Sequence, residues 1–484
     1  MPDAGDPAAL LAAHTAADRA FEATMLAFWS GDASYLRKKP DIASDVTGYW
    51  IFAQAFDAVL DNVARTGRYA GLVETFYLAQ DARGWARDFY DDENWMALAL
   101  LRAYDLTAKA KYLGRAKQLL DDIVDTAQDA TCCGAVKGGL WWDKPHTQKA
   151  TAINAGAVVT AVRMYERTND AKYLDFAKKT FDFWHTNMVD PTSHRVFDHT
   201  KAPGGEVVKY DFTYNEGIMI GACLALYDAT KDPKYRTWAH ETASWTVKEQ
   251  TKTSAQGPVL DDGDDQSCTA DCAQFKGIGY RWLAALHASE PKPDYDAILR
   301  GSAASLLANA RDPKSGLFGI DWSKAPGNII VEANTSAAMA LSIWASSLGK
   351  DPRAKTPLVL EAEDGVLHGL GLEARGPGFQ GWGYVAGWNK DGQWVDFELT
   401  VPAGEYTLSF RYAAGAGDAS RLVHVNGVDV VPNQAFPSTG AWETYKTVDV
   451  TVTLAATNTI SLVYNGGKGS KNFMNLDRLT LTKK

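Results

Sequence analysis

The 484-residue chain has few cysteines, no long apolar run and no excess of basic residues. No stretch approaches the roughly 20 apolar residues of a transmembrane helix, so we expect no membrane partner. The formal net charge of −10 argues against nucleic acid, which attracts clustered Lys and Arg. There is no Gly-x-Ser-x-Gly elbow or phosphate-binding loop, and neither His146 nor His199 has a visible triad partner.

The five cysteines lack the spacing of a zinc site. Cys268 and Cys272 could bridge locally, and Cys132 and Cys133 are adjacent in a loop. Cys223 lies in an apolar helix and is expected to be a buried thiol. One or two disulfides are therefore expected, which favours a secreted protein. The first ten residues do not resemble a signal peptide, so such a segment would already have been removed.

Aromatic residues are abundant, with 16 Trp and 20 Tyr. A core rarely needs so many Trp, whereas sugar-binding clefts use their flat faces. The length predicts two or three domains.

Three stretches that align without gaps indicate an internal repeat. They begin at Tyr104 ("YDLTAKAKYLGRAK"), Tyr165 ("YERTNDAKYLDFAK") and Tyr227 ("YDATKDPKYRTWAH"), and a degenerate fourth copy begins at His287. Each copy carries the end of one helix, a tight turn and the start of the next. Such a repeat predicts helical hairpins.

The two helices of each hairpin differ in character. Those before the turn are apolar nearly all round and belong in an interior, whereas those after it, such as 171–184, are amphipathic. The apolar segments are 51–60, 95–101, 155–162, 217–227 and 337–344. About six such pairs before residue 349 predict an all-α (α/α)6 toroid over residues 1–349.

Loop lengths select one face of this toroid. Turns from inner to outer helices are short, whereas the loops that return from outer to inner helices, called returns below, are long and rich in acids and aromatics. The long returns are 132–148, 190–212, 257–272 and 312–328. Functional residues tend to lie on long loops, and every inner helix begins on this face.

Beyond a linker at 350–357, alternating strands predict a β-sandwich over residues 358–484. The expected strands are 393–401, 405–413, 421–428, 443–452 and 459–466.

Asp91 and Asp92 stand side by side at the start of an inner helix. One interpretation is that they cap the helix or complement its dipole. A second is that paired carboxylates cleave a glycosidic bond. Carboxyls about 5 Å apart suit a retaining enzyme, whereas an inverting enzyme would need the second acid on another loop. Proximity would also separate their pKa values.

Five motifs, "DFYDDENW", "GGLWWD", "RVFDH", "FTYNEG" and "QFKGI", together resemble glycoside hydrolase family 76 over roughly residues 10–349. Members are endo-α-1,6-mannanases on an (α/α)6 barrel. The resemblance implies that Asp91 is the nucleophile and Asp92 the acid/base. It also implies that Asp198 contacts sugar and that Tyr214 and Asn215 line the cleft.

The chain departs from the family pattern at two positions. Glu216 stands where Gln is more usual, and Met96 stands where a second Trp is common. Both changes could alter the sugar subsites.

Further residues are candidates for sugar contact, with packing in the core as the alternative for each. They are Trp95, Trp141, Trp142, Asp143, Asp321 and Trp322. The acids of 261–266 could suggest calcium, but they lack the Gly and Glu of an EF-hand loop. A solvated or sugar-facing loop is therefore favoured there.

In the C-terminal domain, "LEAEDG" and "NLDRLTL" resemble carbohydrate-binding modules of families 6 and 35. The resemblance implies a structural Ca²⁺ held by Glu361, Glu363 and Asp477. The candidates for holding sugar in this module are Tyr384, Trp388, Trp442 and Asn475.

The sequence thus predicts a secreted, monomeric, retaining endo-α-1,6-mannanase acting on α-mannan or manno-oligosaccharides, with an appended glycan-binding module and no catalytic cofactor. Two alternatives are a mannan-directed transglycosylase and a non-catalytic mannan-binding protein. The intact Asp pair argues against the second alternative.

Overall fold

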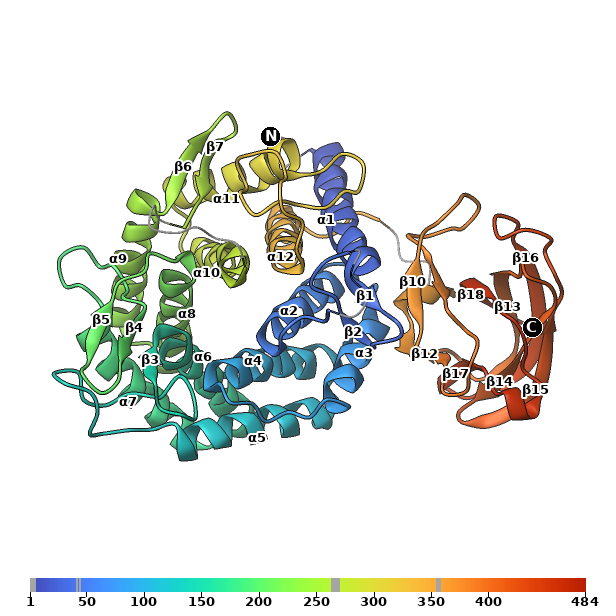
Figure 1. Ribbon diagram of the computed structural model, residues 1–484, viewed down its shortest axis with the longest axis horizontal. Coiled ribbons are helices and arrows are strands. Elements are labelled where there is room, and N and C mark those ends of the chain that lie inside the picture. The colour runs from blue at the N-terminus through green and yellow to red at the C-terminus, as the bar shows by residue number, and fades with distance from the viewer. Residues whose placement is uncertain (1–5, 41, 43–44, 263–269, 354–357) are drawn as a thin grey trace. The chain divides into compact units, whose positions relative to one another are not determined.

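The computed structural model describes residues 6–40, 42, 45–262, 270–353 and 358–484 (Figure 1). Its contacts divide these residues into two compact units. The first takes the described residues of Met1–Phe21, Gly48–Arg65 and Gly84–Asp351, and the second those of Glu22–Thr47, Thr66–Arg83 and Pro352–Lys484. Residues 354–357 of the expected linker and 263–266 of the acid-rich loop lie outside the described residues.

Within the described ranges there are twelve α-helices. They are α1 (Pro7–Phe28), α2 (Tyr49–Thr66), α3 (Ala70–Asp81), α4 (Tyr90–Thr107), α5 (Ala110–Thr126), α6 (Thr151–Thr168), α7 (Ala171–Met188), α8 (Thr213–Thr230), α9 (Pro233–Glu249), α10 (Phe275–Ser289), α11 (Pro293–Ser305) and α12 (Val331–Leu348). In the first unit α2, α4, α6, α8, α10 and α12 surround a common centre, and α5, α7, α9 and α11 lie outside them (Figure 1).

Burial follows the predicted division into inner and outer helices. Every residue of α6 from Thr151 to Val162 is buried, whereas α5 buries one face that includes Tyr112, Ala116 and Leu120. An apolar helix enclosed by neighbours and an amphipathic helix at the surface are what these patterns predict. The all-α toroid is confirmed.

The repeated sequence forms the same turn three times. Each inner helix ends at a left-handed residue, Ala108, Asn169 or Lys231, with φ of 55°, 55° and 58°. The backbone N–H of each donates to the carbonyl of the tyrosine that begins the repeat, at 2.7 Å. This bond satisfies one of the carbonyls left open at a helix end.

The long returns contain short strands that the sequence did not predict. Strands β3 (Gln148–Ala150), β4 (His199–Lys201) and β5 (Glu206–Val208) form an antiparallel sheet. Strands β6 (Thr251–Ser254) and β7 (Gly257–Leu260) form a hairpin. The β3–β4 pairing joins two returns, so it depends on the tertiary fold rather than on a local pattern.

The second unit contains a β-sandwich, so the predicted change from an all-α fold to a β-sandwich is confirmed. One sheet has the order β10-β11-β18-β13-β16, with β8 on β18, and the other has the order β15-β14-β17-β12-β9. The strands are β8 (Val359–Glu361), β9 (Val366–His368), β10 (Gly371–Glu373), β11 (Tyr384–Ala386), β12 (Trp394–Thr400), β13 (Gly404–Ala413), β14 (Ala419–Val425), β15 (Val428–Phe436), β16 (Lys446–Leu454), β17 (Thr457–Val463) and β18 (Asn475–Lys483).

N-terminal segments also belong to this second unit, namely α3 and the pair β1 (Trp29–Ser30) and β2 (Tyr35–Leu36). The indole of Trp29 donates to the Leu370 carbonyl at 3.0 Å. The Leu367 N–H donates to the Thr75 hydroxyl at 2.9 Å. These contacts join residues about 300 positions apart, so no local sequence pattern indicates them.

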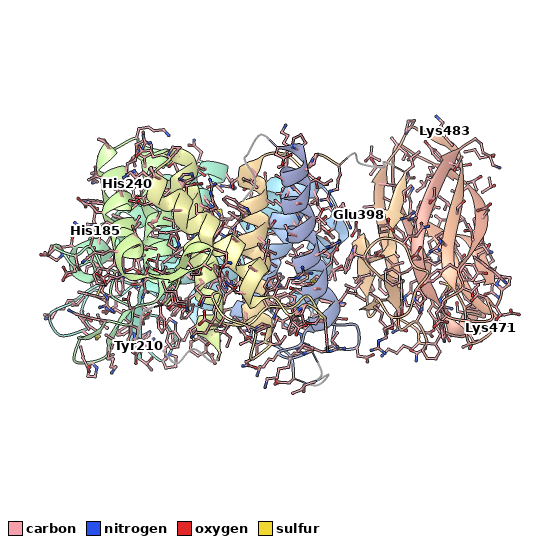
Figure 2. All side chains as sticks on the ribbon, turned by 90° about the horizontal axis from the view of Figure 1, so that it is seen from above. His185, Tyr210, His240, Glu398, Lys471 and Lys483 are labelled. Atoms are coloured by element: carbon pink, nitrogen blue, oxygen red, sulfur yellow. A yellow bond between two sulfur atoms is a disulfide. The ribbon has the colours of Figure 1, made fainter. Side chains whose placement is uncertain are left out.

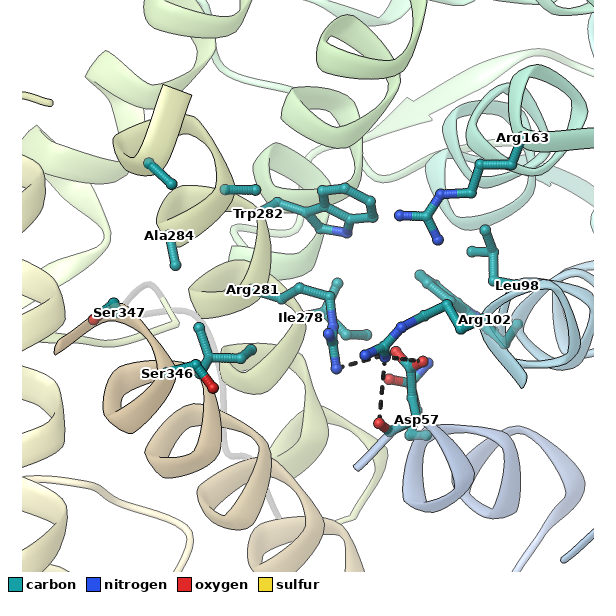
Figure 3. A pocket seen from close by; sticks show the side chains of 15 residues that line it. Asp57, Leu98, Arg102, Arg163, Ile278, Arg281, Trp282, Ala284, Ser346 and Ser347 are labelled. Carbon is teal, nitrogen blue, oxygen red and sulfur yellow. Dashed lines mark hydrogen bonds and ion pairs between the residues drawn. The ribbon is translucent and has the colours of Figure 1, made fainter. Parts of the chain in front are cut away.

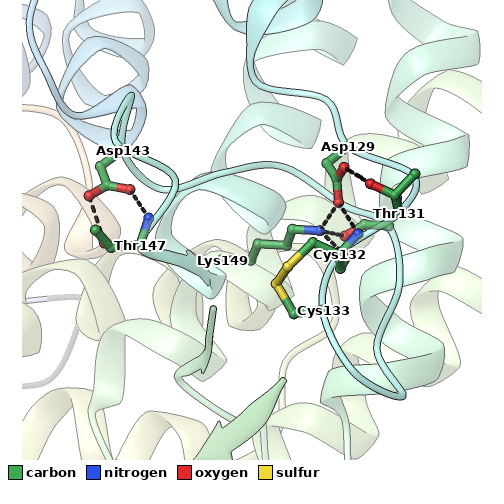
Figure 4. Close-up of a disulfide and its surroundings, with 8 residues drawn as sticks. Asp129, Thr131, Cys132, Cys133, Asp143, Thr147 and Lys149 are labelled. Atoms are coloured by element: carbon green, nitrogen blue, oxygen red, sulfur yellow. Dashed lines mark hydrogen bonds and ion pairs between the residues drawn. A yellow bond between two sulfur atoms is a disulfide. The ribbon is translucent and has the colours of Figure 1, made fainter. Parts of the chain in front are cut away.

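The loop before β3 carries a disulfide between the adjacent Cys132 and Cys133 (Figure 4). Lys149 is fully buried beside it and donates to Asp129 at 2.6 Å, to the Gly138 carbonyl at 2.6 Å and to the Cys132 carbonyl. One disulfide of the one or two expected is thus present, and the sequence had left its pairing open.

The other cysteines divide as follows. Cys223 is the buried thiol that was predicted. Cys272 is also disulfide-bonded, and Cys268 lies outside the described residues. None of the helices in the described ranges is long and apolar enough to span a membrane.

Candidate active site

Asp91 and Asp92 lie in the first turn of α4. The residue that caps this helix is Phe89, which has extended backbone and makes no side-chain cap bond. The two acids therefore do not cap the helix, although the positive end of its dipole still favours a carboxylate there. Asp91 is 9% exposed, and its Oδ1 has no hydrogen-bond partner among the described residues.

The loop that carries Trp142 is hydrogen-bonded to the start of α4. The Tyr90 N–H donates to the Trp142 carbonyl at 2.8 Å, and Phe89 forms a β-bridge with Asp143. The Phe89 and Trp142 rings lie 4.6 Å apart, and the Trp142 indole hydrogen-bonds the Asp91 carboxylate. An aromatic wall is thus held directly beside the acid pair.

The electrostatics of Asp91 and Asp92 favour a state in which the two carboxyls together hold one proton. Burial raises the pKa of Asp91 to about 7, although the Trp142 hydrogen bond opposes the shift. Burial, followed by repulsion from Asp91 and Asp271, raises the pKa of Asp92 to about 9. At neutral pH Asp91 is therefore the more readily ionised group and Asp92 the one that holds the proton.

Asp271 is a third acid at this site, and it was not among the predicted site residues. Its charge raises the pKa of both Asp91 and Asp92. The Trp50 indole, at the start of α2, donates to the Asp271 Oδ1 at 3.3 Å. Its place next to the disulfide-bonded Cys272, in an acid-rich return, is the signal that could have marked it.

Asp198, Tyr214 and Asn215, the residues that the resemblance assigns to the sugar cleft, lie together. The Asp198 carboxylate accepts from the Tyr214 hydroxyl at 2.7 Å and from the Asn215 amide at 3.3 Å. Its other oxygen lies 2.6 Å from the His199 ring. Burial and then Asp198, with a smaller contribution from Asp91, hold the pKa of Tyr214 well above its usual range. The charge of Asp91 therefore acts on Tyr214, which connects Asp198, Tyr214 and Asn215 electrostatically with the acid pair.

The two departures from the family pattern lie inside the protein. Glu216 is fully buried and accepts from the Val196 N–H at 2.8 Å and from the Gln250 amide at 2.6 Å. Burial raises the pKa of Glu216 to about 8. Met96 is likewise fully buried, within α4. Because both side chains are buried, neither can contact a sugar directly. The expected change in the sugar subsites could therefore arise only through altered packing.

The remaining tryptophans in the first unit are mostly covered. Trp141 is 6% exposed, with His146 stacked at 4.6 Å and the Lys149 ammonium 4.6 Å from its ring. Trp322 is fully buried and offers no face for stacking on a sugar. Trp95 is 7% exposed and lines a cavity among the inner helices.

Two other candidate acids stabilise turns. Asp143 accepts from the backbone and the hydroxyl of Thr147, at 2.7 and 2.6 Å. Asp321 accepts from the backbone and hydroxyl of Ser323 and pairs with Lys252 at 2.7 Å. These bonds supply a structural reason for both acids.

In the sandwich, exposed aromatics gather at one end. Trp442 is 37% exposed, and Phe473, which the sequence did not indicate, is 44% exposed. The Trp442 ring lies against Gly415, and Phe473 follows Asn472, whose amide donates to the neighbouring Ala416 carbonyl at 3.4 Å. Lys471 of the same segment is labelled in Figure 2, and Asn475 begins β18. Trp388 is fully buried, and Tyr384 is 4% exposed. Trp442, Phe473 and Asn475 are thus the better-placed candidates for sugar contact.

The predicted calcium ligands are only partly together. An added Cβ at Gly381 would lie 2.8 Å from the Glu363 Oε1 and 2.9 Å from the Glu361 Oε2, so both carboxylates face this point of the chain. Asp477 instead accepts from the Gln380 N–H and pairs with Arg411. Within the described ranges no group of three or more His, Cys, Asp or Glu side chains is arranged to hold a metal ion.

Comparison with known proteins agrees with this architecture. Residues 13–359 match the profile of glycosyl hydrolase family 76, and residues 362–483 match carbohydrate binding module family 6. The Lin0763 protein from Listeria innocua is 28% identical, with a TM-score of 0.64 over 69% of this chain and 97% of its own.

Two further relatives carry names that describe an activity. An inactive variant of the α-1,6-mannanase GH76A of Salegentibacter sp. HEL1_6, solved with α-1,6-mannotriose, is 24% identical, with a TM-score of 0.62 over 69% of this chain and 99% of its own. Mannan endo-1,6-α-mannosidase DCW1 of Candida glabrata is 24% identical over 252 residues, which are 48% of this chain and 55% of the relative. The chain spans about a tenth to about half the length of the first curated relatives it matches.

Proposed function

The chain belongs to glycosyl hydrolase family 76, and from this membership we propose that it is a retaining endo-α-1,6-mannanase. The observation that carries the proposal is the pair Asp91 and Asp92, two adjacent buried carboxyls of unequal acidity beside Trp142. A retaining glycosidase needs one ionised and one protonated carboxyl close together.

Each carboxyl has a defined role in this proposal. Asp91, the more acidic of the two and with an Oδ1 free of hydrogen bonds to described residues, attacks the anomeric carbon and forms a glycosyl ester as the C–O bond to the leaving sugar breaks. Asp92 gives its proton to the departing oxygen. Ionised Asp92 then takes a proton from water, which attacks the same carbon and releases Asp91.

The mannan substrate is supported by the relatives. The Salegentibacter and Candida proteins are named for α-1,6-mannan linkages, and the inactive Salegentibacter variants carry replacements at two consecutive aspartates. Trp142, next to Asp91, supplies an aromatic surface, and the Tyr214–Asp198 pair supplies fixed polar groups for sugar hydroxyls.

Product analysis with linear α-1,6-mannohexaose tests this function. We expect shorter oligosaccharides from internal cleavage, with the α-anomer appearing first in the NMR spectrum because two displacements restore the configuration. Products longer than the substrate would instead identify the transglycosylase. A β-anomer as first product would rule out Asp91 as the nucleophile, and no release of reducing ends would favour the non-catalytic protein.

The pH dependence of kcat/KM should reflect the raised pKa values. Activity needs ionised Asp91 and protonated Asp92, so we expect it to rise as pH approaches about 7 and to fall beyond about 9. Initial rates on manno-oligosaccharide in buffers of constant ionic strength measure this profile. A rising limb near pH 4 would show that Asp91 is not desolvated as the structure has it.

We further propose that the sandwich binds glycan through Trp442, Phe473 and Asn475, and Ca²⁺ through Glu361 and Glu363. Bound Ca²⁺ would supply positive charge to the Glu363 carboxylate, which burial otherwise keeps neutral, next to Glu361, which pairs with Arg478 at 2.5 Å. Burial holds the pKa of Glu363 well above its usual range, and its Oε2 is buried with no partner among the described residues. Oxygen ligands of this kind suit Ca²⁺.

Calcium should therefore stabilise the protein. We expect about 2 to 3 kcal/mol of added stability when free Ca²⁺ exceeds its Kd a hundredfold. Thermal unfolding of EGTA-treated protein with and without Ca²⁺ measures the effect. Glu363→Gln should abolish it, and the exposed Glu398→Gln (Figure 2) should keep it. An equal shift in both variants would contradict the assignment.

The compartment is also part of the proposal. The Cys132–Cys133 disulfide is typical of a protein that works in an oxidising environment, which supports secretion. We propose that the protein acts there as a monomer on α-mannan.

A further inference from the structure

The first unit contains a cavity of about 390 Å³ among the inner helices (Figure 3). Its lining comes from α2, α4, α6, α10 and α12, and it reaches the surface at the exposed Ser346 and Ser347 near the end of α12. The proposed catalytic acids lie in the first turn of α4 and do not line it. Cavities of this size accommodate small organic molecules.

The charges in this cavity do not balance. Arg102 pairs with Asp57 and donates to Asp61 at 2.6 Å, and Arg281 donates to Asp61 at 2.6 and 2.9 Å. Arg163 is the third, and its guanidinium forms no hydrogen bond or ion pair with any described residue. Three guanidinium groups against two carboxylates leave a net positive charge among these described residues, and Asp57, which already pairs with Arg102, is the carboxylate whose charge acts on Arg163.

Arg163 is held so that its guanidinium faces the cavity. It lies over the Trp282 ring, 5.5 Å from the centroid, and Figure 3 shows it directed toward the space shared with Arg102 and Arg281. The Trp282 ring in turn rests on Gly221 of α8, where an added Cβ would lie only 2.6 Å from it. Burial and the charge of Arg102 lower the pKa of Arg163 to about 10, which still leaves it charged at neutral pH.

The rest of the wall is largely apolar. Trp95, Leu98, Ile278, Ala285 and Ile343 contribute to it, and the uncharged polar side chains are Gln54, Ser346 and Ser347. A sugar would leave most of its hydroxyls without partners against such a wall. A dianion would bring two negative charges to a site with one excess positive charge, so one of them would remain uncompensated.

We propose that this cavity binds a small organic monoanion, a carboxylate attached to an apolar body, with the carboxylate on Arg163. The planar guanidinium offers two parallel N–H donors that match the two oxygens of a carboxylate. The apolar body fills the space between the Trp95 and Trp282 rings and the aliphatic wall. The site is separate from the proposed glycosidase chemistry and does not depend on it.

Titration calorimetry of the whole chain with sodium benzoate tests the proposal. We expect one benzoate per chain and a loss of affinity of about tenfold or more in Arg163→Gln. Arg163→Lys keeps the charge but not the planar fork, and should lose affinity by several fold. The matched control Arg300→Gln, an exposed arginine of α11 paired with Asp296, should bind as the unaltered protein does.

Several results would overturn the proposal. They are the absence of saturable benzoate binding up to about 10 mM, equal affinity in Arg163→Gln and the control, or displacement of benzoate by α-1,6-mannotriose. Equal affinity for inorganic phosphate or for uncharged benzyl alcohol would also refute the stated ligand class. Circular dichroism melts establish that each variant is folded, so a loss of binding reports on the site.

Discussion

Asp91→Asn is expected to lower kcat/KM on α-1,6-mannan by about 10³-fold or more, because an amide oxygen is too poor a nucleophile to form the glycosyl ester. Asp92→Asn is expected to lose about 10²- to 10⁴-fold, since the departing sugar oxygen then has no proton donor. The measurement is release of reducing ends from linear mannan.

A second substrate separates the two roles. An aryl mannoside with an acidic phenol as leaving group needs no proton, so Asp92→Asn should retain more activity on it than Asp91→Asn does. The exposed Asp125→Asn on α5 is the matched control and should behave as the unaltered protein. Mannan turnover by folded Asp91→Asn within about tenfold of the control would eliminate the proposed nucleophile.

Both active-site variants should remain folded at neutral pH. The pKa values of Asp91 and Asp92 are raised in the folded protein, so the unfolded chain ionises first as pH rises from about 4. Stability is therefore lost between the unfolded and the folded pKa, and a neutral asparagine avoids that loss. Unfolding temperatures at pH 7 equal to or above that of the unaltered protein are expected.

Lys149→Met is expected to reduce the free energy of unfolding by about 3 kcal/mol, because it removes one partner of a buried ion pair. The Lys149 ammonium holds Asp129 and two backbone carbonyls around the Cys132–Cys133 loop (Figure 4). A methionine would fill a similar volume but remove the ammonium donor from the Gly138 carbonyl and the positive charge from Asp129, which would keep only its bonds from Thr131 and Cys132. Urea unfolding monitored by tryptophan fluorescence measures the difference.

Lys137→Met is the matched control for this variant. Lys137 lies in the same loop but is exposed, so its replacement should change stability by less than about 0.5 kcal/mol. Equal effects of the two substitutions would show that the Lys149 contacts do not stabilise the loop.

The sequence predicted the acid pair but not its full surroundings. Asp91 and Asp92 could be recognised because they are adjacent and begin an apolar helix. The acid-rich return marks Asp271 as a candidate, but only the fold assigns it to the same site, because 179 positions separate it from Asp92. The tryptophans were equally hard to sort, since composition does not reveal which ring a neighbour will cover. Trp141 lies beneath His146, whereas Trp442 is exposed.

The sequence by itself determined the repeated helical hairpins, the change to alternating strands and the order of the two architectures along the chain. These features depend on hydrophobic periodicity and turn chemistry, which act between near neighbours. Tertiary structure alone decided which acids raise one another's pKa, which guanidinium forms no ion pair with the residues that the structure describes, and which early segments pack with the sandwich. Those properties depend on distance and burial among residues far apart in the chain, and burial is what sets the cost of a charge.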